Sequence, residues 1–197
     1  LQDRDGRIWA GTRVHGLFQV RKRGETYEAT PHPGLKKVSV RFLLEDRQGT
    51  LWVATADSGL IRVKNNSVRS YDTRGGLSDN WVNVLFQDSS DNLWIGTQVG
   101  GLFVIPAGKD TIEPFPGTDK LSGNAIRAFY EDHEKTLWVG REGGGLNSIR
   151  NTKIAIYTKK NGLPSDNIFG IYQDHLGTMW TGSRGNGVNI IKNGKIT

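Results

Sequence analysis

The chain has 197 residues and no cysteine, which excludes a disulfide framework and a thiolate metal site. It contains no apolar run of the about 18 residues that a membrane-spanning helix needs. Twenty-six Lys and Arg against 20 Asp and Glu give a formal net charge of +6. This charge either attracts anionic partners or belongs to an ordinary solvated surface.

One pattern occurs five times. An Asp is followed six positions later by a Trp and, eight positions after the Trp, by a Leu or Val that comes directly after a Gly. The copies are Asp3/Trp9/Leu17, Asp46/Trp52/Leu60, Asp88/Trp94/Leu102, Asp132/Trp138/Leu146 and Asp174/Trp180/Val188. Successive Trp residues lie 43, 42, 44 and 42 positions apart, and repeats of about 40 to 45 residues are typical of β-propeller blades. The sequence therefore predicts an all-β propeller of about five four-stranded antiparallel blades.

The expected strands follow in chain order. The first copy keeps only Leu1 and Gln2 of its innermost strand. Alternating apolar residues and polar turns predict strands at 41–45, 51–55, 59–64 and 68–72 in the second copy, and at 82–86, 93–97, 101–105 and 112–115 in the third. The fourth copy begins with a strand at 126–131, and the fifth ends where its outer strand would begin. The blades of this single propeller are expected at 1–34, 35–76, 77–120, 121–162 and 163–197.

Each repeated residue has an expected structural role. The Asp opens a tight turn, where its carboxylate accepts hydrogen bonds from backbone N–H groups two residues on. The Trp wedges between neighbouring blades, and its ring N–H reaches a backbone carbonyl. The repeated Gly supplies a positive φ or a close backbone approach between the second and third strands.

Three fragments carry a resemblance to a known family. They read Glu-Asp-Arg-Gln-Gly-Thr-Leu-Trp-Val-Ala-Thr at 45–55, Asn-Leu-Trp-Ile-Gly-Thr at 92–97 with Gly-Gly-Leu at 100–102, and Asn-Gly-Leu-Pro-Ser-Asp-Asn at 161–167. Over its whole length the chain resembles the two-component regulator propeller repeat family. The resemblance implies a periplasmic sensor propeller of a bacterial signalling protein, whose membrane helix and kinase or diguanylate cyclase output lie outside these residues.

The resemblance also implies a ligand, because several members of the family bind oligosaccharides. We expect a small molecule or an oligosaccharide, and the basic charge favours an anionic one. No nucleic acid partner is expected, and contact with a membrane is expected only through other parts of the parent protein.

The loops between the second and third strands of each copy, here called the rim, differ most between copies. In a propeller these loops surround one mouth of the channel, and repeats that share a scaffold diverge where they meet a ligand. The rim candidates for ligand binding are Arg13, His15, Asp57, Gln98, Arg141, Glu142, Arg184 and Asn186. Arg141 stands where the first three copies carry the usual Thr.

A second candidate set lies on the inner strands. Arg41, Asn83 and Arg127 each precede their Asp by five residues, so they share one register at the channel mouth. Trp81 adds an aromatic ring where the other copies carry Ser39, Ala125 and Asn167. It either stacks on the apolar face of a sugar or packs under a loop.

The sequence shows no nucleophile elbow, no phosphate-binding loop and no His pair at metal spacing, so we predict neither catalysis nor a cofactor. Two alternatives stay open. One is a propeller lyase or hydrolase acting on an acidic polysaccharide, for which Asp57 and Glu142 are the acidic pair on the rim. The other is a protein interaction platform.

Five blades are fewer than the resemblance implies. The sequence favours a fragment of a seven-bladed ring over a closed five-bladed ring. A third alternative is self-association of copies through open blade edges.

Overall fold

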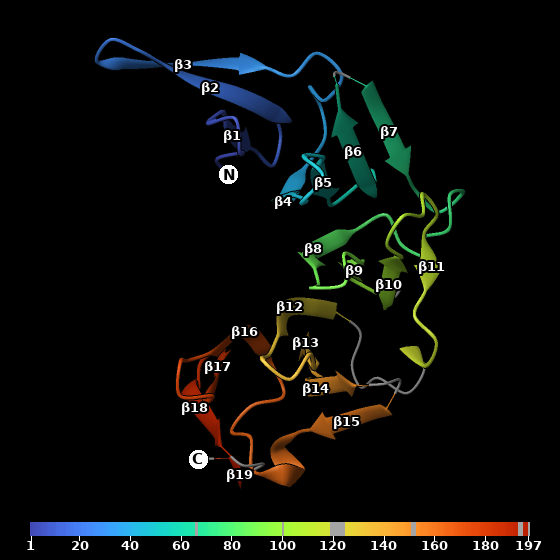
Figure 1. Ribbon diagram of the computed structural model, residues 1–197, viewed down its shortest axis with the longest axis vertical. Coiled ribbons are helices and arrows are strands. Elements are labelled where there is room, and N and C mark those ends of the chain that lie inside the picture. The colour runs from blue at the N-terminus through green and yellow to red at the C-terminus, as the bar shows by residue number, and fades with distance from the viewer. Residues whose placement is uncertain (66, 100, 119–124, 151–152, 193–194, 197) are drawn as a thin grey trace.

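The computed structural model describes residues 1–65, 67–99, 101–118, 125–150, 153–192 and 195–196. These residues form five antiparallel sheets that follow one another in chain order along an open arc (Figure 1). The predicted all-β propeller architecture is confirmed. No helix in the described part of the chain is long and apolar enough to cross a membrane.

The strand order in every sheet follows the chain. The first sheet holds β1 (Ile8–Gly11), β2 (Leu17–Arg23) and β3 (Thr26–Pro31), and the second holds β4 (Val40–Glu45), β5 (Leu51–Thr55), β6 (Leu60–Lys64) and β7 (Ser67–Tyr71). The third holds β8 (Val82–Gln87), β9 (Leu93–Thr97), β10 (Leu102–Ile105) and β11 (Glu113–Pro114). The fourth holds β12 (Ala125–Glu131), β13 (Leu137–Glu142), β14 (Gly145–Arg150) and β15 (Lys153–Tyr157). A short 3-10 helix, η2 (Lys159–Asn161), precedes the fifth sheet of β16 (Ile168–Gln173), β17 (Met179–Ser183), β18 (Gly187–Lys192) and β19 (Lys195–Ile196).

The inner strands β4, β8, β12 and β16 face the centre of the arc, while β7, β11 and β15 lie on its outside (Figure 1). The first sheet has three strands because Gln2 makes only a single bridge to Ile8. The predicted strand at 112–115 shrinks to the two residues of β11, although Phe115 beyond it still donates its N–H to the carbonyl oxygen of Leu102. The expected border between the third and fourth blades, at 120 and 121, lies outside the described residues.

The core consists of clusters that each join two neighbouring blades. Leu60 of the second blade, for example, packs with Leu93 and Ile105 of the third. Leu17, Leu60, Leu102 and Leu146 hold the same position in successive blades, and each is 0% exposed. Val188 holds that position in the fifth blade and is 65% exposed. The outer face of the fifth blade therefore lacks the cover that every preceding blade receives from its neighbour.

Both expected roles of the repeated Gly are confirmed. Gly59 has a φ of 74°, a region that favours glycine, and the four equivalent glycines are also at positive φ. A Cβ at Gly59 would lie 2.2 Å from the carbonyl oxygen of Tyr71. The turn between β5 and β6 therefore needs glycine both for its conformation and for the close approach of the outer strand.

The repeated Asp organises each inner hairpin. Asp46 Oδ1 accepts the backbone N–H groups of Gln48 (2.9 Å) and Thr50 (2.8 Å). Its Oδ2 accepts the ring N–H of Trp52 at 2.8 Å, and the other four copies repeat this last bond. The predicted turn role is confirmed, but the predicted carbonyl partner for the Trp ring was wrong. The carboxylate is the stronger acceptor, because a hydrogen bond to an ionised group is shorter and stronger than one to a carbonyl.

A further repeated contact was not predicted. The residue directly before each Asp is Glu or Gln, and in the last four copies its side chain accepts a backbone N–H from the turn of the preceding blade. The bonds run from Arg4 to Glu45 (2.8 Å), Arg47 to Gln87 (2.8 Å), Ser89 to Glu131 (2.8 Å) and His133 to Gln173 (3.0 Å). The signal was present in the sequence, since all five copies carry Glu or Gln at this position.

Candidate functional site

The inner-strand candidates stand near the start of their strands, at the opposite end from the Asp turns. Arg41 is the second residue of β4, Asn83 the second of β8 and Arg127 the third of β12. Because β4, β8 and β12 are neighbours along the arc, the three side chains form a row from the second blade to the fourth. We call this row, with the residues that contact it, the mouth.

Arg41 and Trp81 meet at one end of the mouth. The guanidinium carbon of Arg41 lies 5.5 Å from the centre of the Trp81 ring, which belongs to the next blade. Trp81 is 39% exposed. A cation over an exposed indole is a stable pair, and it presents both a charge and an aromatic surface to solvent.

Asn83 occupies the middle of the mouth and is 91% buried, since its exposed fraction is 9%. Its Nδ2 donates to Gln98 Oε1 at 3.1 Å and to the carbonyl oxygen of Ile126 at 3.2 Å. Within the described part of the chain, Asn83 Oδ1 has no hydrogen-bond partner. A buried acceptor without a partner costs free energy unless a water or ligand supplies a donor.

Arg127 and Glu142 meet at the other end. Arg127 Nε donates to Glu142 Oε2 at 2.9 Å, and its Nη2 donates to the same oxygen. The guanidinium carbon also lies 5.6 Å from the centre of the Phe169 ring of the next blade. Arg127 is therefore held in place by an ion pair and an aromatic ring, and its side chain is only 16% exposed.

The remaining rim candidates do not join this row. Asp57 accepts the backbone N–H of Ser39 at 3.1 Å and the hydroxyl of Ser58 at 2.9 Å, which ties the rim to the chain before β4. Asn186 donates to the carbonyl oxygen of Pro164 at 2.6 Å. Arg13, His15 and Arg184 are exposed on their turns. The two carboxylates of the acidic pair therefore bind different partners. Asp57 accepts hydrogen bonds from two serines, and Glu142 forms an ion pair with Arg127.

Arg141 is buried rather than exposed on the rim, and its expected role as a ligand contact stays a prediction. It is the fifth residue of β13, where it pairs with Ile126 and Gly145, and only 3% of its surface is exposed. Burial lowers the pKa of its guanidinium to about 10. The equivalent Thr55 is also fully buried, where its hydroxyl donates to the carbonyl oxygen of Gly59. The divergent Arg therefore occupies a buried position of the scaffold.

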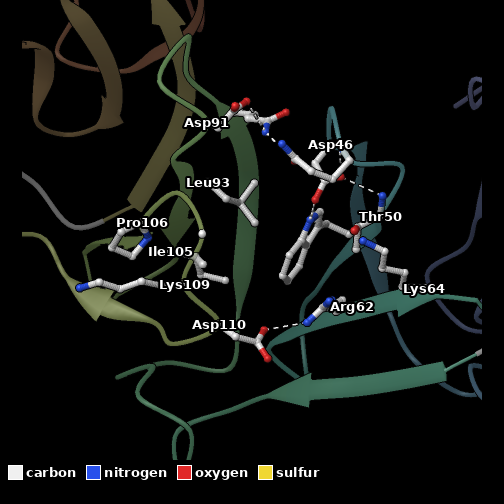
Figure 2. A pocket seen from close by; sticks show the side chains of 14 residues that line it. Asp46, Thr50, Arg62, Lys64, Asp91, Leu93, Ile105, Pro106, Lys109 and Asp110 are labelled. Atoms are coloured by element: carbon white, nitrogen blue, oxygen red, sulfur yellow. Dashed lines mark hydrogen bonds and ion pairs between the residues drawn. The ribbon is translucent and has the colours of Figure 1, made fainter.

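A hollow of about 320 Å³ lies between the second and third blades, on the side of the Asp turns (Figure 2). Arg62 points across it to Asp110 at 2.7 Å. Asp110 also accepts the Tyr71 hydroxyl at 2.5 Å and a hydrogen bond from Arg69. These contacts tie the loop after β10 to β6 and β7, so the charges at this hollow hold two blades together.

Asp110→Asn is expected to lower the melting temperature at pH 7. The Tyr71 hydroxyl and two arginines keep the pKa of Asp110 below its ordinary value of 3.8. A carboxylate with a depressed pKa stabilises the fold above the unfolded pKa, and this contribution is lost as the pH falls through the folded pKa. The difference in melting temperature between wild type and variant should therefore shrink below about pH 4. An equal difference at pH 7 and pH 3 would contradict the assignment.

No group of three or more His, Asp or Glu side chains among the described residues is arranged to hold a metal ion. The comparisons with known proteins agree with the fold. The family model described as "Two component regulator propeller" matches residues 34–57, 76–98, 120–140 and 162–185. No curated protein matches the chain.

Two similar solved structures are extracellular domains of putative hybrid two-component systems of B. thetaiotaomicron. BT3049 is 26% identical with a TM-score of 0.80, over 96% of this chain and 26% of that one. BT4673 is 24% identical with a TM-score of 0.78, over 100% of this chain and 30% of that one. The chain thus spans less than a third of either structure.

An enzyme also shares the fold. Virginiamycin B lyase of Staphylococcus aureus is 16% identical with a TM-score of 0.73, over 100% of this chain and 67% of that one. At this identity the likeness concerns the fold alone.

Proposed function

The chain belongs to the two-component regulator propeller family, and from that premise we propose that it is a ligand-sensing module that binds an oligosaccharide at the mouth. The module would lie on the periplasmic side of the membrane and carry out no catalysis of its own. The likeness to extracellular domains of two-component systems supports this placement.

The arrangement of Arg41, Trp81 and Asn83 is the observation that carries the proposal. The exposed Trp81 ring suits the apolar face of a sugar, and the guanidinium of Arg41 beside it suits a carboxylate or sulfate group. The buried Asn83 donates to Gln98 and so fixes the orientation of a second amide group at the mouth. The net charge of +6 favours an acidic oligosaccharide over a neutral one.

Isothermal titration with matched acidic and neutral oligosaccharides tests the proposal. We expect the acidic ligand to bind more tightly and its affinity to fall as salt is added. Arg41→Gln should weaken its binding by at least about tenfold, because one charge-assisted hydrogen bond is worth roughly 1.5 to 3 kcal/mol.

Arg23→Gln is the matched control. Arg23 ends β2 in the first blade and pairs with Glu28, away from the mouth, so its loss should leave affinity unchanged. The proposal fails if no oligosaccharide binds, or if the Arg41 and Arg23 variants lose affinity equally.

A further inference from the structure

Four blades each pack a second ring against the repeated Trp. The ring centres are 5.9 Å apart for Tyr71 and Trp52, 5.4 Å for Phe115 and Trp94, 5.8 Å for Tyr157 and Trp138, and 6.2 Å for His32 and Trp9. The four partner residues are equivalent, because each lies opposite the buried Leu of its own blade on the neighbouring strand. In the first blade, the backbone N–H of His32 donates to the carbonyl oxygen of Leu17. The first blade therefore has an imidazole where the next three have a phenol or a phenyl ring.

Open space lies beside the Trp9 and His32 rings. Two cavities, of about 330 Å³ and 440 Å³, lie beside the Trp9 ring, and both are lined by Trp9, Gln19 and His32. Both lie at the junction of the first and second blades, with Leu51 or Val68 on the far wall. In the second blade, the corresponding Tyr71 extends its hydroxyl to Asp110.

His32 carries a buried polar atom that the fold leaves unused. Its Nδ1 has no hydrogen-bond partner among the residues that the structure describes. Burial lowers the pKa of His32 below its ordinary value of 6.5, so the ring is neutral at pH 7. A neutral imidazole offers one donor and one acceptor, and leaving either unpaired in a buried place is unfavourable.

The lining of the larger cavity is uncharged and has an apolar part and a hydrogen-bonding part. Its lining consists of Trp9, Gln19, Thr30, Pro31, His32, Pro33, Gly34 and Val68, none of which is charged at pH 7. Trp9, the two prolines and Val68 provide an apolar surface, while Gln19, Thr30 and His32 provide hydrogen-bonding groups. Its volume of about 440 Å³ falls in the range of small-molecule sites, roughly 300 to 1,000 Å³.

We propose that this cavity between the first and second blades is a second ligand site, and that it binds a single neutral pyranose sugar. A pyranose has an apolar face for the Trp9 ring and hydroxyl groups for Gln19, Thr30 and the part of the His32 ring that lines the cavity. The absence of charged side chains from the cavity lining selects against an acidic sugar. The site shares no residue with the mouth, so it goes beyond the proposed function and does not depend on it.

The test uses the indole N–H signals of the six Trp residues in an NMR titration of the 197-residue chain. The probes are the methyl glycosides of glucose, galactose and mannose. Trp9→Phe and Trp81→Phe assign the signals of the two sites. We expect at least one glycoside to shift the Trp9 signal saturably. A Trp9 signal that none of the three moves would overturn the proposal, whatever happens at Trp81.

His32→Tyr restores the residue type found in the second and fourth blades, so it should fill the hollow and abolish the Trp9 shift. His133→Tyr, an exposed histidine in the fourth blade, is the matched control and should leave the shift unchanged. If His32→Tyr does not fold, Thr30→Val removes one hydroxyl from the exposed strand β3 and should weaken binding about tenfold. An undiminished Trp9 shift in a folded His32→Tyr or Thr30→Val protein would also refute the site.

Discussion

Trp52→Ala is expected to destabilise the protein by about 3 to 5 kcal/mol, the range for removing a buried aromatic ring. The side chain is 5% exposed and packs in the cluster that contains Leu93 and Ile105 of the next blade. Its ring N–H also donates to Asp46, so the variant loses an interblade wedge and a hydrogen bond together. Urea unfolding followed by circular dichroism measures the loss.

Trp180→Ala is the matched control for the wedge. Trp180 has the same position in the fifth blade and the same bond to its Asp, but it is 36% exposed because no blade covers it. We expect its removal to cost less than about half as much, since less apolar surface is lost. Equal losses for the two variants would show that the ring stabilises its own hairpin and not the contact between blades.

The fold could be predicted because its determinants are local and repeated. A spacing of 42 to 44 residues between Trp residues is set by four short strands and their turns. In the second copy, for example, Asp46 and Gly59 form turns whose hydrogen bonds join residues only four positions apart. Turns of this kind can be predicted from a single sequence, and the same pattern in five copies strengthens the prediction.

The site was harder to predict because it depends on which side chains of different blades meet. The shared register predicted that Arg41 and Asn83 occupy equivalent positions at the channel mouth. It did not predict that Arg41 stacks on Trp81 or that Asn83 donates to Gln98. The burial of Arg141 was missed for the same reason, because divergence from the Thr of the first three copies does not distinguish a ligand contact from a buried replacement. His32 carried no signal until its alignment with Tyr71 was visible in the structure.

Asp46→Ala should destabilise the protein by about 3 kcal/mol. Asp46 is only 8% exposed, and its carboxylate accepts three hydrogen bonds, two from backbone N–H groups and one from Trp52. Its removal leaves these donors without a partner, and a buried unpaired donor costs roughly 1 to 3 kcal/mol. Part of this is recovered because water reaches the edge of the turn, which keeps the total below the sum of three full penalties.

Two further variants separate the turn from the ring. In Asp46→Asn, the amide oxygen still accepts the N–H groups of the turn, but the amide nitrogen faces the N–H of Trp52 as a second donor. We therefore expect a loss smaller than that of Asp46→Ala, with the Trp52 indole signal shifted in NMR. Asp174→Ala removes the same bonds in the fifth blade, where water replaces them more easily, so it should cost the least of the three. A loss as large at Asp174 as at Asp46 would mean that burial by the next blade adds nothing to the strength of the turn.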